Sequence, residues 1–489
     1  MNMGESPSVT SGKVGPLKVG RPVEALFDEL RSIHQKHGDD LKGWPAYVRS
    51  LSTADEIRTC EYALFDDTDG KTAVQINDEP EEGPWEIDAV IRGGEGTNYD
   101  RDFRIVLTFP GDWPKRPARV RIKGILHHIL LMDGNEPMPV FYHPQGTYAP
   151  SNTEGTYDIM TCLKAVHGFF SAPLKWPEGS MSPLQEREIA RQWEEAAASD
   201  AERHEIISKY RNDVGAKHNA LFEAADSKVL PRAWFDAEFA RVVLDGEGDA
   251  DAIRAMVKEE CTGAYSFPFV TKEFSDMVIE EAEHYQQSGL PVRRPNSMNA
   301  YGLILNEIGL EGLMDALQQQ AFLPVSRALF PAEVACRFDA HHSFLVHYEI
   351  GHDLGLDMHT DDSDITFNTC LGKEFEGAGL TICGVMGEEG MRKLRHVYSH
   401  VVGRCLVHLG RHRHGADDIT KGERLNLICW NHNYLWRKSS PYKTLTLPDE
   451  TEPPDAQCLS FTHDRDHPNA KPSAWYPPKR SEVRFDKRV

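Results

Sequence analysis

The spacing of apolar residues predicts a helix followed by strands in the first part of the chain. Apolar side chains over residues 26–33 recur three or four positions apart, which predicts an amphipathic helix that ends near His37. Alternation over residues 85–92 and an almost continuous apolar run over 103–109 predict two strands, and prolines break the chain after them. Over residues 183–225 helical spacing returns among Glu, Ala and Arg, which predicts helices with a solvated face.

The second part of the chain carries more strands. A polar, glycine-rich stretch over residues 245–249 predicts a hinge before it. Helical spacing over 272–287 and 312–329 predicts two helices. The strands that follow are short and bounded by turns, which is typical of an antiparallel sandwich or barrel. They are predicted over residues 342–350, 366–371, 380–385, 405–409 and 424–430.

Composition and charge are those of a globular intracellular protein. The chain has 489 residues, 40% hydrophobic and 27% charged, so it can bury more than one core. Its formal net charge of −22 repels phosphate backbones, and we expect no nucleic-acid partner. The longest apolar run is too short to cross a bilayer, and the first residues lack the apolar core of a secretory signal. We therefore expect no membrane partner and a cytoplasmic or nuclear location.

The cysteines carry no metal or redox motif. There are nine, and no two form a Cys-x-x-Cys pair, which argues against zinc-ribbon and thioredoxin chemistry. Cys370, Cys383, Cys405 and Cys429 fall inside apolar runs, so we expect them to be reduced core residues.

A His-x-acid pair is the first candidate for metal chemistry, but the spacing alone is not specific. With 22 His and 76 acidic residues in the chain, chance gives about three such pairs. The sequence contains three, so the neighbouring residues must decide among them. The pairs are His37 with Asp39, His347 with Glu349, and His359 with Asp361.

The residues around His359 and Asp361 favour that pair. On an extended segment residues two apart face the same side, so both side chains can bind one ion. His414 lies in a later segment and can supply a third ligand. The strand that opens with Arg424 places one cation on the face it shares with Asn426, Ile428 and Trp430. Taken as an isolated pair, the two residues are better explained as polar strand ends.

Two histidines and one carboxylate suit non-haem Fe(II), because three ligands on one face of the ion leave open positions for a bidentate acid and dioxygen. With these motifs in place, residues 265–430 resemble the 2-oxoglutarate and Fe(II)-dependent dioxygenases of the prolyl and lysyl hydroxylase type. The likeness is greatest to the "2-oxoglutarate and iron-dependent oxygenase domain-containing" proteins. The matching pieces are residues 294–302, 348–354, 359–361, 366–368, 375–380 and 414–424.

This resemblance implies a double-stranded β-helix, or jelly roll, with His359, Asp361 and His414 as iron ligands. Arg424 would bind the 5-carboxylate of 2-oxoglutarate, and Tyr348 would hydrogen-bond the same co-substrate. The implied cofactors are Fe(II), 2-oxoglutarate and O2, with ascorbate as an accessory. The implied reaction converts 2-oxoglutarate to succinate while a C–H bond is hydroxylated. Ala378 departs from the family pattern, in which relatives usually carry a glycine at this position. His347 is expected to have a structural role.

The first part of the chain resembles the ubiquitin-conjugating enzyme fold over residues 25–225. The strand over 103–109 is followed by the series Phe-Pro-Gly-Asp-Trp-Pro-Lys-Arg-Pro, and His143 and Cys162 fall where that family has its His-Pro-Asn turn and thioester cysteine. Gln145 replaces the family's Asn, a donor whose loss costs about 10²–10³ in rate. The interpretation we favour is a non-catalytic interaction domain, and Cys162 is the candidate nucleophile if ubiquitin is transferred.

We therefore expect a multidomain α+β protein in which a ubiquitin-conjugating-like domain is joined by helices to a jelly-roll dioxygenase. It would hydroxylate a protein side chain, prolyl or lysyl, with ubiquitin or proteins of its pathway as further partners. Two alternatives remain open: a conjugating enzyme whose barrel senses oxygen or 2-oxoglutarate, and a scaffold without activity. The expected divisions are a disordered start (1–22), the conjugating-like domain (23–225), a connector (226–262), the dioxygenase domain (263–440) and a proline-rich extension (441–489).

Overall fold

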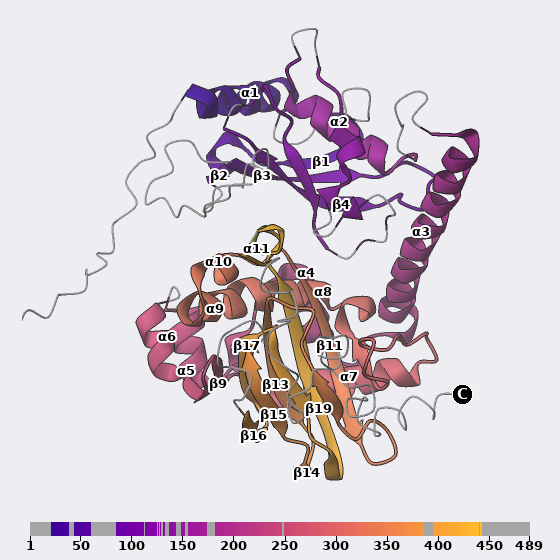
Figure 1. The fold of residues 1–489 in the computed structure, drawn as a ribbon. Helices are drawn as coiled ribbons and strands as arrows, with labels where there is room; N and C mark the ends of the chain where they lie inside the picture. Colours follow the sequence, from indigo (N-terminus) through magenta and orange to yellow (C-terminus); the bar gives the residue numbers. More distant parts are fainter. Residues whose placement is uncertain are drawn as a thin grey trace, which may run out of the picture.

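Two units form the molecule, and the helix α3 joins them (Figure 1). Residues 1–20 of the expected disordered start, most of the proline-rich extension and the turn at His143 lie outside the residues that the structure describes. Residues 21 and 22, expected to be disordered, are the first residues of a helix. The computed structural model describes residues 21–38, 44–59, 85–111, 113–124, 126, 128, 131–132, 136–142, 148–151, 155–173, 181–246, 249–385, 395–439 and 441–442.

The N-terminal unit is an antiparallel sheet with helices beside it. Its strands follow the order β1-β3-β4-β5, with β2 on β3, so neighbours in sequence are mostly neighbours in space. Every second residue of β3 is buried, and the predictions of a first helix and of two strands are confirmed. The elements are α1 (Arg21–His37), β1 (Val48–Leu51), β2 (Arg58–Thr59), β3 (Trp85–Arg92), β4 (Asp102–Phe109), β5 (Arg119–Ile122), β6 (Leu131–Met132), β7 (Glu136–Pro137) and α2 (Ile159–Phe169).

The helix α3 (Pro183–Lys209) belongs to both units. It starts at Ser182 with a capping box, in which the side chains of Ser182 and Gln185 bond each other's backbone N–H groups. Trp193 packs in the N-terminal core, and α3 leads directly into a π turn (Tyr210–Val214) whose first residue, Tyr210, packs in the C-terminal core. The boundary between the units therefore lies within this helix.

Two sheets build the C-terminal unit. The larger has the order β10-β11-β19-β13-β17-β9-β8, with β14 on β19, and the smaller has the order β12-β18-β15-β16. Apolar residues from both sheets, such as Phe344 and Ile428 from the larger and Leu380 and Ile382 from the smaller, share one core cluster. The sheets thus pack face to face, as a jelly roll requires.

The five strands predicted in this unit are confirmed. Seven further strands among the described residues were not predicted: β8, β9, β10, β12, β14, β16 and β18. The strands are β8 (Lys258–Cys261), β9 (Ala264–Pro268), β10 (Gly302–Ile304), β11 (Ala340–Glu349), β12 (Leu356–His359), β13 (Ile365–Gly372), β14 (Phe375–Gly377), β15 (Leu380–Val385), β16 (Arg395–Tyr398), β17 (Arg404–Leu409), β18 (His412–Ala416) and β19 (Ile419–His432).

Helices cover the outer face of the larger sheet, and the expected connector is part of that layer. Trp234, Phe239 and Ile253 are buried in the same core as Phe367 of β13. The described residues of the expected connector, 226–246 and 249–262, therefore pack as part of the C-terminal unit. The helices are α4 (Asn219–Ser227), α5 (Ala237–Phe239), α6 (Ala250–Met256), α7 (Lys272–Gln287), α8 (Glu311–Leu317), α9 (Leu323–Leu329), α10 (Ala332–Ala335) and α11 (Tyr434–Lys438).

The strand cysteines follow the expectation with one exception. Cys370, Cys405 and Cys429 are buried free thiols. Cys383 is disulfide-bonded, so the expectation of a reduced thiol was wrong there. Among the described residues, no helix combines the length and the apolar character needed to cross a membrane.

Candidate metal centre

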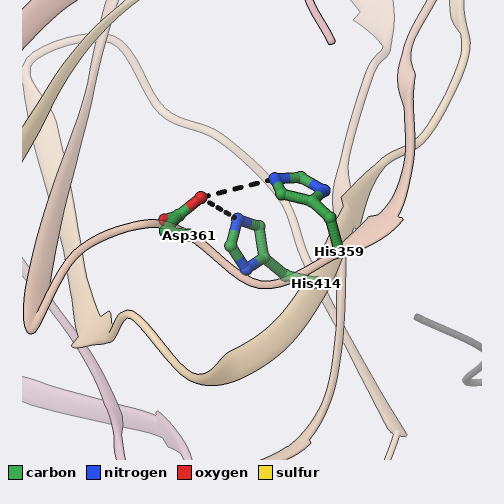
Figure 2. Close-up of side chains that lie close together, drawn as sticks. All are labelled: His359, Asp361 and His414. Carbon is green, nitrogen blue, oxygen red and sulfur yellow. Dashed lines mark ion pairs between the residues drawn. The ribbon is translucent and has the colours of Figure 1, made fainter. Parts of the chain in front are cut away.

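The two histidines of the predicted site face each other on neighbouring strands. His359 ends β12 and His414 lies in β18, and the two residues are direct partners in the antiparallel register. Asp361 lies just beyond the end of β12, where its backbone N–H donates to the carbonyl of Gly410 over 2.9 Å. All three side chains come together as predicted, with the carboxylate pointing toward both imidazole rings (Figure 2).

One oxygen of Asp361 lies close to both rings. Its Oδ1 is 3.4 Å from His359 Nε2 and 3.5 Å from His414 Nε2. The three ligand atoms lie within 4.8 Å of one another, which leaves room for one ion between them. The arrangement is two imidazole nitrogens and one carboxylate oxygen on one side of a point, which suits Fe(II).

Hydrogen bonds on the far side of each ligand fix its orientation. His359 Nδ1 donates to the carbonyl of Asp357 over 2.7 Å, and His414 Nδ1 donates to the carbonyl of His412 over 2.8 Å. With the proton on Nδ1, the Nε2 lone pairs point toward the site. Thr366 Oγ1 donates to Asp361 Oδ2 over 2.6 Å and leaves the other carboxylate oxygen for the metal.

The protonation states also suit a metal. Burial lowers the pKa of His414 to about 3, so the ring is neutral at physiological pH. Burial opposes ionisation of Asp361, but the nearby His414 and His359 outweigh it, and the pKa of this carboxyl is lowered. A neutral imidazole and an ionised carboxylate are the forms that bind divalent iron.

The triad opens on a cavity that Arg424 and Tyr348 also line. The Arg424 guanidinium lies over the Tyr348 ring, 4.7 Å from its centre, and its Nη1 donates to the carbonyl of Ala378. Arg424 is 1% exposed, and its Nε has no partner among the described residues. A buried guanidinium with a free N–H beside a metal triad fits the carboxylate of a bidentate acid. Both residues therefore lie where the resemblance implied.

The predicted face of β19 is confirmed, while other cavity residues were missed. Arg424, Asn426, Ile428 and Trp430 all line the cavity, although β19 starts five residues earlier than predicted. Further polar lining comes from Asn299, whose Nδ2 donates to Tyr348 Oη over 3.3 Å. The signal was present, because the segment 294–302 matched the family, but it assigned no role to a particular side chain. The other missed polar residues are Asn296, Thr366 and Asn368.

Ala378, the departure from the family pattern, lies in a left-handed backbone conformation with φ of 51°. Glycine occupies this region without cost, which agrees with the glycine that the resemblance led us to expect at this position. Its carbonyl accepts a hydrogen bond from Arg424, so the strained turn points an oxygen at the guanidinium.

Cys162 lies apart from this cavity, in helix α2 of the N-terminal unit. Its side chain is fully buried, and burial is the main cause that raises the pKa of the thiol to about 12. A protonated, enclosed thiol is not a nucleophile at neutral pH. This placement fits the interpretation as a core residue.

A second group of a histidine and two carboxylates lies on the other side of the larger sheet. We call His347, Glu349 and Glu423 the outer cluster. Glu349 and Glu423 are direct cross-strand partners, and His347 Nε2 is 3.1 Å from Glu423 Oε2. Lys373 Nζ lies 2.8 Å from Glu423, so a cation already pairs with that acid, and His352 Nδ1 lies 2.9 Å from Glu349. His347 thus takes part in surface ion pairs, in agreement with its expected structural role.

Comparison with known proteins identifies the family. Residues 206–335 match the model of the OGFOD2-like domain. The human "2-oxoglutarate and iron-dependent oxygenase domain-containing protein 2" is 35% identical over 251 residues, which are 50% of this chain and 69% of that protein. The Arabidopsis thaliana "2-oxoglutarate and iron-dependent oxygenase domain-containing protein ICU11" is 34% identical over 199 residues, 39% of this chain and 50% of its own length. The chain thus spans about half the length of this plant relative.

A solved oxidoreductase of the 2OG-Fe(II) oxygenase family from Burkholderia pseudomallei aligns with 38% of this chain and 93% of its own, at 16% identity and a TM-score of 0.27. The family assignment rests on the sequence relatives, which carry iron and 2-oxoglutarate in their names. The chain belongs to the 2-oxoglutarate and iron-dependent oxygenase domain-containing proteins.

Proposed function

We propose that the chain is an Fe(II)- and 2-oxoglutarate-dependent dioxygenase that hydroxylates a protein side chain. The observation that carries the proposal is one cavity lined by the His359, Asp361 and His414 triad and by the buried Arg424. When bound, iron and 2-oxoglutarate supply a reaction in which O2 and a C–H bond yield a C–OH bond, succinate and CO2.

In this reaction the residues of the chain bind the co-substrate and orient the metal ligands. Arg424 holds the far carboxylate of the co-substrate, because its guanidinium is buried in the cavity wall with a free Nε. Tyr348, whose ring lies under the guanidinium, hydrogen-bonds the same co-substrate. Asn299 orients the Tyr348 hydroxyl by donating a hydrogen bond to it. The backbone hydrogen bonds of the two histidines keep their Nε2 atoms directed at the metal before it binds.

Two observations support the proposal of a protein substrate: the name of one relative and the presence of the N-terminal unit beside the cavity-bearing unit. The rat "Multifunctional procollagen lysine hydroxylase and glycosyltransferase LH3" is 28% identical over 239 residues, and its name states action on a protein side chain. We assign the N-terminal unit, which is built as helix, sheet and helix in chain order, to recruitment of that substrate. The burial of Cys162 supports recruitment rather than transfer of ubiquitin by this unit.

The test is anaerobic titration of the full chain with Fe(II) and then 2-oxoglutarate. We expect a weak visible charge-transfer band that appears only with both, because the co-substrate must chelate the iron through one end. Admission of O2 should then release succinate. A chain that binds Fe(II) but shows neither the band nor succinate would contradict the proposal.

A further inference from the structure

The inward side chains of β19 divide the cavity into two ends. Arg424 and Trp430 lie on the same face of the strand, six residues apart, which corresponds to about 20 Å along the strand. Trp430 pairs in register with Thr366, whose hydroxyl holds Asp361, so the metal ligands are level with Trp430. The far carboxylate of 2-oxoglutarate, paired with Arg424, takes the Arg424 end of the cavity, and the diacid extends from there toward the metal. The wall at Trp430 is left for the substrate that is oxidised.

This wall is aromatic with one free donor. Phe344 lies edge-on to the Trp430 ring at 5.0 Å between centres, and His342 lies beside it at 5.7 Å. The indole N–H of Trp430 is shielded from solvent and has no acceptor among the described residues. A buried donor without a partner costs free energy, which a bound carbonyl oxygen would recover.

A preformed loop closes the wall on its other side. Arg294 ties the loop together by donating to the carbonyls of Asn296 over 2.8 Å and Ser297 over 2.6 Å. The Asn296 carboxamide oxygen accepts the backbone N–H groups of Met298 and Asn299 over 2.8 and 2.7 Å. His342 Nε2 then joins the loop to β11 through the carbonyl of Pro295 over 2.8 Å. The wall is therefore in place before a substrate arrives.

The wall carries no negative charge. Among the described residues that line the cavity, Asp361 is the only carboxylate, and it is a metal ligand. With Fe(II) and 2-oxoglutarate bound, the charges of the ion and Arg424 balance those of Asp361 and the co-substrate dianion. Burial also lowers the pKa of His342, which leaves this ring neutral. An ammonium group would lose water here and find no anion in exchange, a cost that an uncharged side chain avoids.

We propose that the Trp430 end of the cavity binds an uncharged side chain, of the prolyl rather than the lysyl type, and that the Trp430 indole N–H donates to a peptide carbonyl beside it. The inference rests on the proposed function and names its substrate class. An aromatic wall can also attract cations through its ring faces, so the comparison must separate charge from shape.

The experiment uses the full chain loaded with Zn(II), a redox-inactive stand-in, and 2-oxoglutarate. Ligand-detected NMR measures the affinities of three probes, the N-acetyl methylamides of proline, norleucine and lysine. Norleucine matches the lysine chain without its charge. We expect the proline and norleucine probes to bind at least about tenfold more tightly than lysine. Equal or tighter binding of lysine, or no binding of any probe, would overturn the inference.

The variant Trp430→Phe tests the donor while keeping an aromatic ring. Loss of one hydrogen bond of about 1.4 kcal/mol weakens the proline probe about tenfold. Trp436→Phe is the matched control, because Trp436 packs on the core outside the cavity, and it should leave all affinities unchanged. An unaltered proline affinity in Trp430→Phe would contradict the assigned hydrogen bond.

Affinity for 2-oxoglutarate is measured first in each sample, because it separates two kinds of failure. Absent 2-oxoglutarate binding in the wild type would defeat the proposed function itself. Intact 2-oxoglutarate binding without the probe preference would defeat only the substrate class.

Discussion

In the described part of the chain, two groups of histidine and carboxylate side chains have ligand atoms close enough to share a metal, and their surroundings distinguish them. Both contain a His-x-acid pair, and both have ligand atoms within 4.8 Å of one another. In the inner group, His359 and His414 donate their Nδ1 protons to carbonyls, so their other nitrogens are free for a metal. In the outer cluster, Lys373 already occupies Glu423. A metal site therefore depends on the absence of competing cations as much as on ligand spacing.

The largest expected difference between the two groups is in iron affinity. His359→Ala removes one of three protein ligands, and we expect Fe(II) affinity to fall by at least about 100-fold, more than the 10–100-fold typical of lost supporting groups. His347→Ala is the matched change in the outer cluster and should leave Fe(II) affinity unaltered. Anaerobic titration followed by the charge-transfer band measures both. Equal losses in the two variants would mean that the outer cluster binds the iron.

The next difference concerns neighbouring residues of β19 that face opposite sides. Arg424→Ala leaves the far carboxylate of 2-oxoglutarate desolvated and unpaired, at about 2–5 kcal/mol, or roughly 30-fold to several-thousand-fold in affinity. Fe(II) affinity should barely change. Glu423→Gln, one residue earlier on the outer face, should leave 2-oxoglutarate affinity alone. Succinate formation against 2-oxoglutarate concentration, at equal iron loading, gives the half-saturation points, and an unshifted value for Arg424→Ala would remove its assigned role.

The smallest effect is on stability and depends on pH. Burial raises the pKa of Glu423, but Lys373 and His347 outweigh it and the pKa is lowered. A lowered pKa means that Glu423 stabilises the fold above its unfolded pKa and that this contribution is lost as pH falls through the folded value. We expect Glu423→Gln to destabilise by less than about 1 kcal/mol near pH 7, because the pair is partly solvated. Urea unfolding should show the gap closing below about pH 4; a gap that widens there would contradict the ion pair.

The sequence predicted the long strands and the ligands because their patterns are local. The strands β13 and β15, for example, are buried at every position, and their mostly apolar or small residues agree with burial on both faces. The strands β12 and β18 were missed, since each is short and mixes His with apolar residues. The residues around His359 and Asp361, with His414 and Arg424 further along the chain, indicated the site without those strands.

Other features depend on contacts that no local pattern records. The spacing of charged and apolar residues in α3 does not change at the boundary between the two units. The sequence therefore could not show that Trp193 and Tyr210 pack in different cores. The roles of Asn296 and Thr366 likewise depend on which backbone groups and carboxylates the fold brings beside them.

The continuous helix α3 fixes the distance between the two units. At 27 residues it spans about 40 Å, and Asp200 near its middle is tied to Arg101 of the N-terminal unit over 2.6 Å. A second tie joins Arg121 of β5 to Asp339, the residue before β11. Because the two units are held at a set separation, a polypeptide captured by the first unit would reach the cavity only through a stretch of suitable length. Target choice would then depend on the distance between the captured motif and the oxidised residue, and insertions in that stretch would shift which residue is modified.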